Sequence, residues 1–147
     1  MSKDLTNSDI ARQNILNNQY ALQEIQKSVG ISGIMFENEF KFTKKQLADF
    51  FEVSERTVEN FIRKNKEELA KNGYEVIAGK RLTDFKLALH SQSDPEMDFV
   101  IKTVRLGIFN FRAFLNLGML LTESVKALEL RSATLDITWC QRMTFLR

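Results

Sequence analysis

The chain has 147 residues, of which 44% are hydrophobic and 27% charged, and its net charge is only +2. This length suits one domain with short additions, and the composition is that of an ordinary soluble globular protein. No apolar run is long enough for a membrane span and no signal-peptide core is present, so we expect a cytoplasmic protein. One cysteine and one histidine, far apart, exclude a disulfide framework and a structural zinc site.

Residues 1–29 are predicted to form an N-terminal helical arm after a frayed start. The pair Asn17 and Asn18 weakens this helix, which otherwise runs from about Ser8 to Ser28. Two interpretations stay open, a dimerising arm or a surface helix folded onto its own domain. The broken apolar stripe of this helix comprises Ile10, Ile15, Leu16, Leu22, Ile25 and Val29.

Residues 30–42 change to the period of a strand. Phe40 and Phe42 alternate with the charged residues Glu39 and Lys41, which is typical of a half-buried strand. We therefore expect a small hairpin here, leading directly into the next segment.

Residues 43–68 are predicted to form two helices joined by a tight turn. Thr43 and Gln46 have the spacing of a capping box, and Ser54 is a suitable N-cap for the second helix. Glu52 occupies the turn position where glycine is usual, so it must adopt a left-handed conformation or the turn must differ. The residues expected to pack the two helices together are Leu47, Ala48, Phe51, Val53, Val58 and Phe61.

This pattern is that of a helix-turn-helix, whose second helix offers its polar face to the major groove of DNA. Arg56, Thr57 and Asn60 lie on the first turns of that helix, so we expect them to contact base edges. An ordinary helical hairpin in a small core is the alternative. The residues expected to contact phosphates are Thr43, Lys44, Lys45, Ser54, Arg63, Lys64, Lys80 and Arg81.

The segment after the second helix is predicted to be a basic β-hairpin. Lys71-Asn72-Gly73 resembles a helix C-cap, and residues 74–78 and 81–86 are expected to be strands around a turn at Gly79-Lys80. A hairpin in this position would act as the wing of a winged helix, touching phosphates or a minor groove. Its lysines could instead only keep an exposed edge soluble.

Residues 91–147 form a second region with its own pattern. A polar connection around Pro95 leads to a strand, expected most clearly over 104–109, and Asn110 and Ser124 can each cap a helix. The first of these helices is so apolar that we expect a dimer interface on it, whereas the alternative is that it fills the core of its own chain against Phe99, Ile101 and the arm. The tail, 138–147, has no usable periodicity, and two interpretations stay open, a truncated reading frame or a segment that packs on another chain. The expected interface residues are Phe114, Leu117, Leu120 and Leu121.

Charge is distributed unevenly along the chain. Residues 41–90 carry eleven basic and eight acidic side chains, a net of +3, against −2 for residues 1–40 and +1 for residues 91–147. Because affinity for DNA grows with the number of phosphates neutralised, so weak a field argues for a homodimer or a helper protein.

The segment FTKKQLADFFEVSERTVENFIRKN, with a strand pair before it and a basic hairpin after it, resembles the N-terminal part of RhuM-type proteins, which are DNA-binding regulators of phages and genomic islands. The segment GIFNFRAFLNLGMLLTESVKALELRS is similar in style to C-terminal regions of phage antirepressors. The resemblance implies an α+β, mainly helical protein with a winged helix-turn-helix over residues 30–90. It also implies a sequence-specific regulator of a mobile element, binding double-stranded DNA in the bacterial nucleoid.

The sequence does not indicate an enzyme. It lacks a P-loop, a dinucleotide fingerprint and metal-ligand spacing, so we expect no cofactor, no metal and no small-molecule ligand. Two alternatives to a DNA-binding regulator stay open. One is an antirepressor-type module that binds another protein, and the other is an accessory protein in mobile-element replication or DNA processing.

Overall fold

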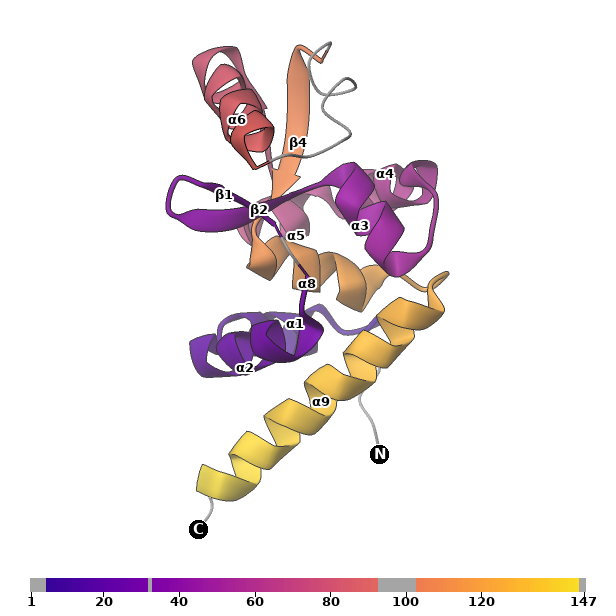
Figure 1. Cartoon of the computed structure of the whole chain (residues 1–147). Coiled ribbons are helices and arrows are strands. Elements are labelled where there is room, and N and C mark those ends of the chain that lie inside the picture. The colour runs from indigo at the N-terminus through magenta and orange to yellow at the C-terminus, as the bar shows by residue number, and fades with distance from the viewer. Residues whose placement is uncertain (1–4, 32, 93–102, 146–147) are drawn as a thin grey trace.

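The computed structural model describes residues 5–31, 33–92 and 103–145, with residues 139–145 described by their backbone alone. Figure 1 shows these parts as helices gathered around a small sheet. The described elements are, in chain order, α1 Asp9–Leu16, α2 Gln19–Val29, β1 Ile34–Phe36, β2 Glu39–Thr43, α3 Lys44–Phe51, α4 Glu55–Lys64, α5 Lys66–Lys71, β3 Glu75–Ala78, α6 Gly79–Ser91, β4 Arg105–Phe109, α8 Phe111–Leu120 and α9 Val125–Phe145. The protein is therefore α+β and mainly helical, as the sequence predicted.

The four strands form one antiparallel sheet with the order β1-β2-β4-β3. The predicted hairpin is present as β1 and β2, joined at Glu37 and Asn38, both of which have positive φ. The last strand, β4, lies between β2 and β3, with Phe42 opposite Phe109 and Ile77 opposite Leu106. Because side chains alternate along a strand, β4 supplies a hydrophobic residue to each face of the sheet.

One face of the sheet is covered by α6. Leu82, Phe85 and Leu89 recur at helical spacing along α6 and are buried against the strands. The ring of Phe85 meets that of Phe36 edge-on, with centroids 5.3 Å apart. The other residues of this small cluster are Ile34, Ile77, Leu106 and Ile108.

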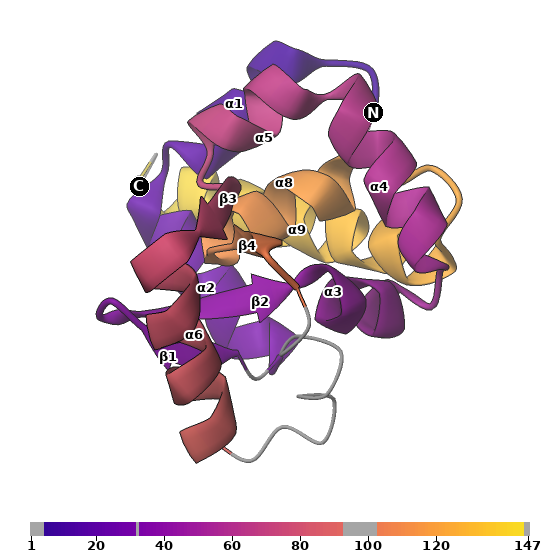
Figure 2. The ribbon, with the colours of Figure 1, turned by 90° about the horizontal axis from the view of Figure 1, so that it is seen from above.

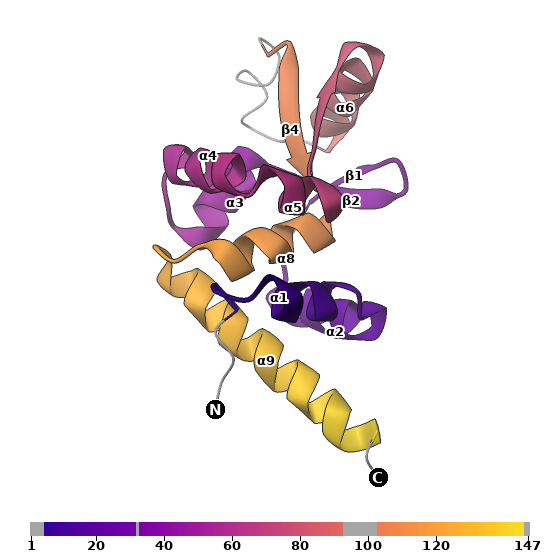
Figure 3. The same ribbon diagram turned by 180° about the vertical axis from the view of Figure 1, so that it is seen from behind.

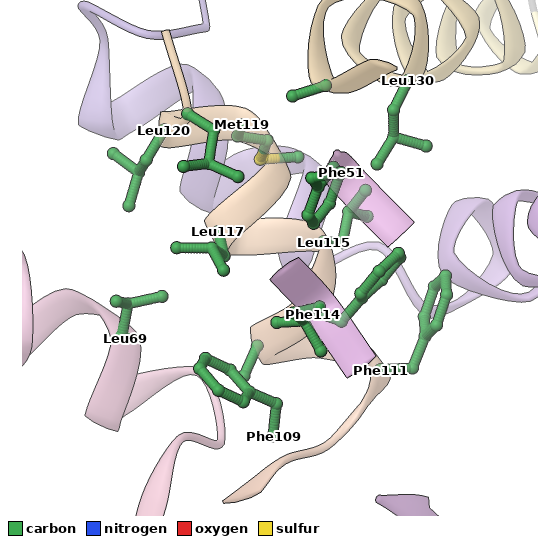
Figure 4. Packing of buried hydrophobic residues seen from close by; sticks show 14 of the residues in the cluster. Phe51, Leu69, Phe109, Phe111, Phe114, Leu115, Leu117, Met119, Leu120 and Leu130 are labelled. Atoms are coloured by element: carbon green, nitrogen blue, oxygen red, sulfur yellow. The ribbon is translucent and has the colours of Figure 1, made fainter. Parts of the chain in front are cut away.

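The opposite face of the sheet packs on a much larger cluster centred on α8 (Figure 4). Phe114 is fully buried there, and its ring stacks on that of Phe51 from α3 with centroids 5.2 Å apart. Phe42 of β2 and Phe111 approach the same ring, each at 5.5 Å. The three sequence ranges 1–29, 30–90 and 91–147 all contribute to this one cluster.

Helices α1, α2 and α9 close the far side of the cluster, where α2 packs along α9 (Figure 3). The expected single N-terminal helix is two helices, because Asn17 ends α1 and the side chain of Asn18 caps α2. The tail, for which the sequence predicted nothing regular, continues α9 as far as Phe145. Ser124 caps α9 as predicted, accepting a hydrogen bond of 3.0 Å from the backbone N–H of Ala127.

The predicted strand over 81–86 is wrong. These residues belong to α6, and the strand that pairs with β3 is β4, which follows much later in the chain. The apolar spacing of three and four residues through Leu82, Phe85 and Leu89 is that of a helix, and it buries one side of α6 on the sheet. Residues 74–86 are therefore not a simple hairpin.

The predicted dimer interface on α8 is also wrong. Phe114, Leu117 and Leu121 are fully buried within the chain, and Leu120 is 6% exposed. These side chains pack against α3, α4, the sheet and α1 of the same chain, so they are not available to a second copy. The alternative, a helix that fills its own core, is correct for the contact with the N-terminal helices, whereas Phe99 and Ile101 lie outside the described residues.

Candidate nucleic-acid interface

Helices α3 and α4, called here the helix pair, meet at a tight turn formed by residues 52–54. Thr43 and Gln46 complete the predicted capping box at the start of α3, with hydrogen bonds of 2.9 and 3.2 Å. Glu52 ends α3 in the left-handed conformation with φ 57°, and the N–H of Val53 donates to the carbonyl of Ala48 at 3.0 Å. A left-handed non-glycine residue costs about 1 kcal/mol, which the packed helices on either side must offset.

The first turn of α4 is held by its own hydroxyl groups. The Ser54 side chain accepts a hydrogen bond of 3.1 Å from the backbone N–H of Thr57. The two hydroxyl oxygens of Ser54 and Thr57 also lie 3.0 Å apart and form a hydrogen bond. This turn, which carries the predicted DNA contacts Ser54, Arg56 and Thr57, is therefore held by hydrogen bonds within the chain.

Helix α4 buries one narrow stripe of side chains, and the rest of its surface faces solvent. Val58 and Ile62 are its buried residues, packed on the core between α3 and α8. The opposite side carries the predicted residues Arg56, Asn60 and Arg63, of which the two arginines are exposed and Asn60 is half-buried. We call this side the outward face of α4, defined by Arg56, Glu59, Asn60, Arg63 and Lys64.

Cations on the outward face are largely free of acidic partners. Arg56 and Arg63 form no salt bridge within the described residues, and Lys64 lies over the ring of Phe61 at 5.7 Å from its centroid. A guanidinium without a carboxylate partner keeps its donors for an external acceptor. The outward face therefore offers two guanidinium groups without salt-bridge partners in the described part of the chain, on an ordered scaffold.

Lys44 of α3 is tied to the outward face by an ion pair with Glu59. The ammonium of Lys44 donates to Oε1 of Glu59 at 2.9 Å, with the two side chains 28% and 49% exposed. The hydrogen bond from Lys44 and its positive charge hold the pKa of Glu59 below its ordinary value. Glu59 was not among the predicted site residues, although it lies three positions after Arg56 and four before Arg63, on the same side of the helix.

Tyr74, also not predicted, lies close to this ion pair. Its ring packs on Phe109 with centroids 4.7 Å apart, and a Cβ on Gly107 would fall 2.5 Å from its hydroxyl oxygen. Burial raises the pKa of Tyr74, while the charge of Lys44 lowers it by a smaller amount and that of Glu59 adds slightly to the rise. Tyr74 thus fills the corner between the helix pair and the strands β3 and β4.

Three of the predicted phosphate contacts do not belong to this surface. Thr43 is buried and its hydroxyl serves the capping box. Lys80 and Arg81 are on α6, on the other side of the sheet from α4 (Figure 2). Arg81 is moreover occupied by two carboxylates, donating to Glu37 at 2.5 Å and to Glu75 at 2.6 Å. The prediction grouped them with α4 because it placed them on a hairpin beside it.

The remaining predicted contacts lie on the helix pair itself. Lys44 and Lys45 begin α3, Ser54 caps α4, and Arg63 and Lys64 end α4. The structure thus brings together eight of the predicted residues, which are Arg56, Thr57, Asn60, Lys44, Lys45, Ser54, Arg63 and Lys64.

The described part of the chain contains no cluster of His, Cys, Asp or Glu arranged to bind a metal ion. Within the same residues, no helix combines the length and the apolar character that crossing a bilayer requires. Comparison with protein-family models, with curated proteins and with solved structures finds no match to this chain.

Proposed function

We propose that this protein is a non-enzymatic, sequence-specific regulator that binds double-stranded DNA through a winged helix-turn-helix. In this proposal it acts in the bacterial cytoplasm and regulates a phage or another mobile element. The observation that carries the proposal is the outward face of α4, where Arg56 and Arg63 are exposed and lack carboxylate partners among the described residues. The helix beneath that face is fixed by the caps at Thr43 and Ser54 and by the buried side of α4. A rigid helix with free guanidinium groups suits the major groove.

The strands support a winged arrangement that differs from the predicted hairpin. β2 precedes the helix pair, β3 and β4 follow it, and the three pair in the order β2-β4-β3. β4 rises beyond the helix pair in Figures 1 and 3, and it contacts α3 of that pair. In this proposal the β3–β4 ribbon is the stem of the wing.

The proposal assigns a role to each predicted residue that lies on the helix pair. Arg56, Thr57 and Asn60 contact base edges, since they occupy the first turns of α4, with Arg56 and Asn60 on its outward face. Lys44, Lys45, Arg63 and Lys64 contact phosphates, and Ser54 adds a hydroxyl at the start of α4. Lys80 and Arg81 are left out of the interface because α6 lies across the sheet. The proposal keeps the homodimer, with an interface other than α8, because one copy neutralises few phosphates.

Titration of the whole protein into labelled duplexes of random sequence tests this function. We expect binding at low salt, with log affinity falling linearly against log salt. Arg63→Ala and Lys64→Ala should each reduce that slope by about one unit for each bound copy. The control is Lys27→Ala, which removes the same charge from a lysine on α2 whose side chain is 76% exposed. Absence of binding at low salt would reject the function.

One observation favours the antirepressor-type alternative, in which the same surface binds a protein. Glu52, Glu55 and Glu59 are exposed around α4, so the surface has mixed charge, which complements a protein surface as readily as DNA. A protein that ignores duplex DNA but forms a stable complex with a purified repressor would support this alternative.

A further inference from the structure

A carboxylate in the middle of a DNA-facing surface needs a reason, and the proposed function does not supply one. Glu55 has a reason within the chain, because an acidic residue in the first turn of a helix interacts favourably with the helix dipole. Glu59 is in the second turn of α4 and gains nothing from that effect. Next to phosphates it would be repelled, unless its charge is compensated and its oxygens accept hydrogen bonds.

The carboxylate of Glu59 is positioned to accept a hydrogen bond from a partner. Lys44 donates to Oε1 at 2.9 Å, which compensates the charge and restricts the side chain. Oε2 accepts no hydrogen bond from the described residues, and half of the side chain is exposed. The flanking guanidinium groups of Arg56 and Arg63 lie one turn away on either side. The free oxygen is therefore presented between two groups that we assign to DNA.

A carboxylate accepts hydrogen bonds and cannot donate them, which restricts the base it can face in the major groove. Guanine presents two acceptors there and thymine one, so both would repel Oε2. Adenine offers an amino group beside its own acceptor N7, whereas cytosine offers its N4 amino group with no acceptor on the same base, next to the O6 of its paired guanine. Cytosine is the base whose groove edge matches this oxygen best.

We infer that Glu59 is a specificity-determining residue that selects cytosine at one position of the DNA site, and that Lys44 is the positioning residue that holds it. This inference rests on the proposed function and adds to it the chemistry of one recognised base pair. The competing interpretation is that the Lys44–Glu59 pair only braces α3 against α4. An exposed ion pair of that kind contributes little to stability and carries no sequence information.

Selection from random duplexes with the whole protein, followed by affinity measurements, separates these interpretations. The native chain should enrich a site with an invariant cytosine, and changing that cytosine to thymine should weaken binding about tenfold. Glu59→Gln should lose this dependence, with less than a twofold difference between the two sites. Since glutamine pairs well with adenine, selection with Glu59→Gln should enrich adenine at the same position.

Matched variants control for loss of charge and of fold. Glu67→Gln removes an exposed carboxylate from α5, and should keep the full discrimination against thymine. Lys44→Met and Lys45→Met remove the same charge from adjacent residues of α3. Lys44→Met should reduce the discrimination between cytosine and thymine, whereas Lys45→Met should weaken both sites equally. Thermal unfolding of each variant reports whether the fold is intact.

The outcomes are distinct. If Glu59→Gln binds DNA and still prefers cytosine tenfold, Glu59 is only a brace and the inference is overturned while the function stands. A folded Glu59→Gln variant that weakens both sites alike overturns it in the same way. If the native chain binds no duplex at low salt, the proposed function fails and the inference fails with it.

Discussion

Helices α4 and α8 are both ten residues long, but α8 is almost entirely buried and α4 is mostly exposed. Every residue of α8 except Arg112 is buried, including the polar Asn116. Only Val58 and Ile62 are buried in α4, and its charged residues face outward. α8 is thus the central helix of the core. α4 is a surface helix packed on that core, and the exposed side of α4 is accessible to a partner.

The difference shows which sequence patterns predict the surroundings of a helix. The amphipathic pattern of α4 contains both of its sides, so the predicted burial of Val58 is confirmed, although Phe61 is only half-buried and Ile62 is buried in addition. The apolar pattern of α8 says only that the helix is covered, and not by what. The cover is α1, α5, α9, the helix pair and the sheet, and much of it is distant in sequence.

The largest expected effect is the loss of folding stability caused by a substitution in α8. Leu117→Asp places a carboxylate at a fully buried position, which removes a core leucine and leaves a charge without a partner. Truncating a buried leucine alone costs about 2–5 kcal/mol, and typical domains have only about 5–15 kcal/mol in all. We therefore expect the whole chain to be unfolded, measured by circular dichroism and urea titration.

Leu87→Asp is the matched control, because Leu87 lies on α6 and is 64% exposed. It should change the urea midpoint little. A folded Leu117→Asp protein with half the sedimenting mass of the native chain would contradict the core role of α8 and return it to the dimer interface.

A second test concerns the polar network that attaches α1 to the core. Arg12 of α1 is 8% exposed as a side chain and donates two hydrogen bonds of 2.7 Å to Glu68 of α5. Asn116 of α8 also donates to Glu68, at 2.6 Å. Arg12→Ala would leave the carboxylate partly buried without its cation, so we expect a loss of about 3–5 kcal/mol in the free energy of unfolding.

The pH dependence of unfolding gives this test its specificity. Burial would raise the pKa of Glu68, but hydrogen bonds from Arg12 and Asn116 outweigh it and lower the pKa below the ordinary value of 4.5. The resulting stabilisation is present above pH 4.5 and is lost as the pH falls through the lowered pKa. In Arg12→Ala this acid-dependent loss should shrink. An unchanged acid limb would show that Arg12 does not stabilise the ionised form of Glu68.

Sequence reasoning succeeded where the determinants are local. The capping box at Thr43, the N-caps at Ser54 and Asn110, and the turn at Glu52 all depend on residues a few positions apart. It failed where partners are far apart in sequence. The strand that pairs with β3 comes after α6, and Arg81 is neutralised by Glu37 from the β1–β2 turn.

A third test concerns two residues on the exposed side of α4. Arg56→Ala and Asn60→Ala should each reduce affinity by about 1–3 kcal/mol for the preferred site and relax the preference at one base position, because arginine matches guanine and asparagine matches adenine. Their stability should stay close to native, unlike that of any α8 variant. Selection from random duplexes gives the preference, and an unchanged preference in both variants would remove these residues from base recognition.

The smallest expected effect separates two arginines that the sequence grouped together. Arg63 has no salt bridge within the described residues, whereas Arg81 is held between Glu37 and Glu75, and the hydrogen bond that it donates lowers the pKa of Glu37. Removing Arg63 should therefore flatten the salt dependence of DNA binding by about one unit for each bound copy, since a counterion-releasing contact is lost. Arg81→Ala should leave that slope unchanged, because α6 lies across the sheet from α4 and the charge is already compensated. Both slopes come from anisotropy titrations of the same duplex at several salt concentrations. If Arg81→Ala flattens the slope as much as Arg63→Ala does, α6 belongs to the interface, and the outward face of α4 is only part of the surface that meets DNA.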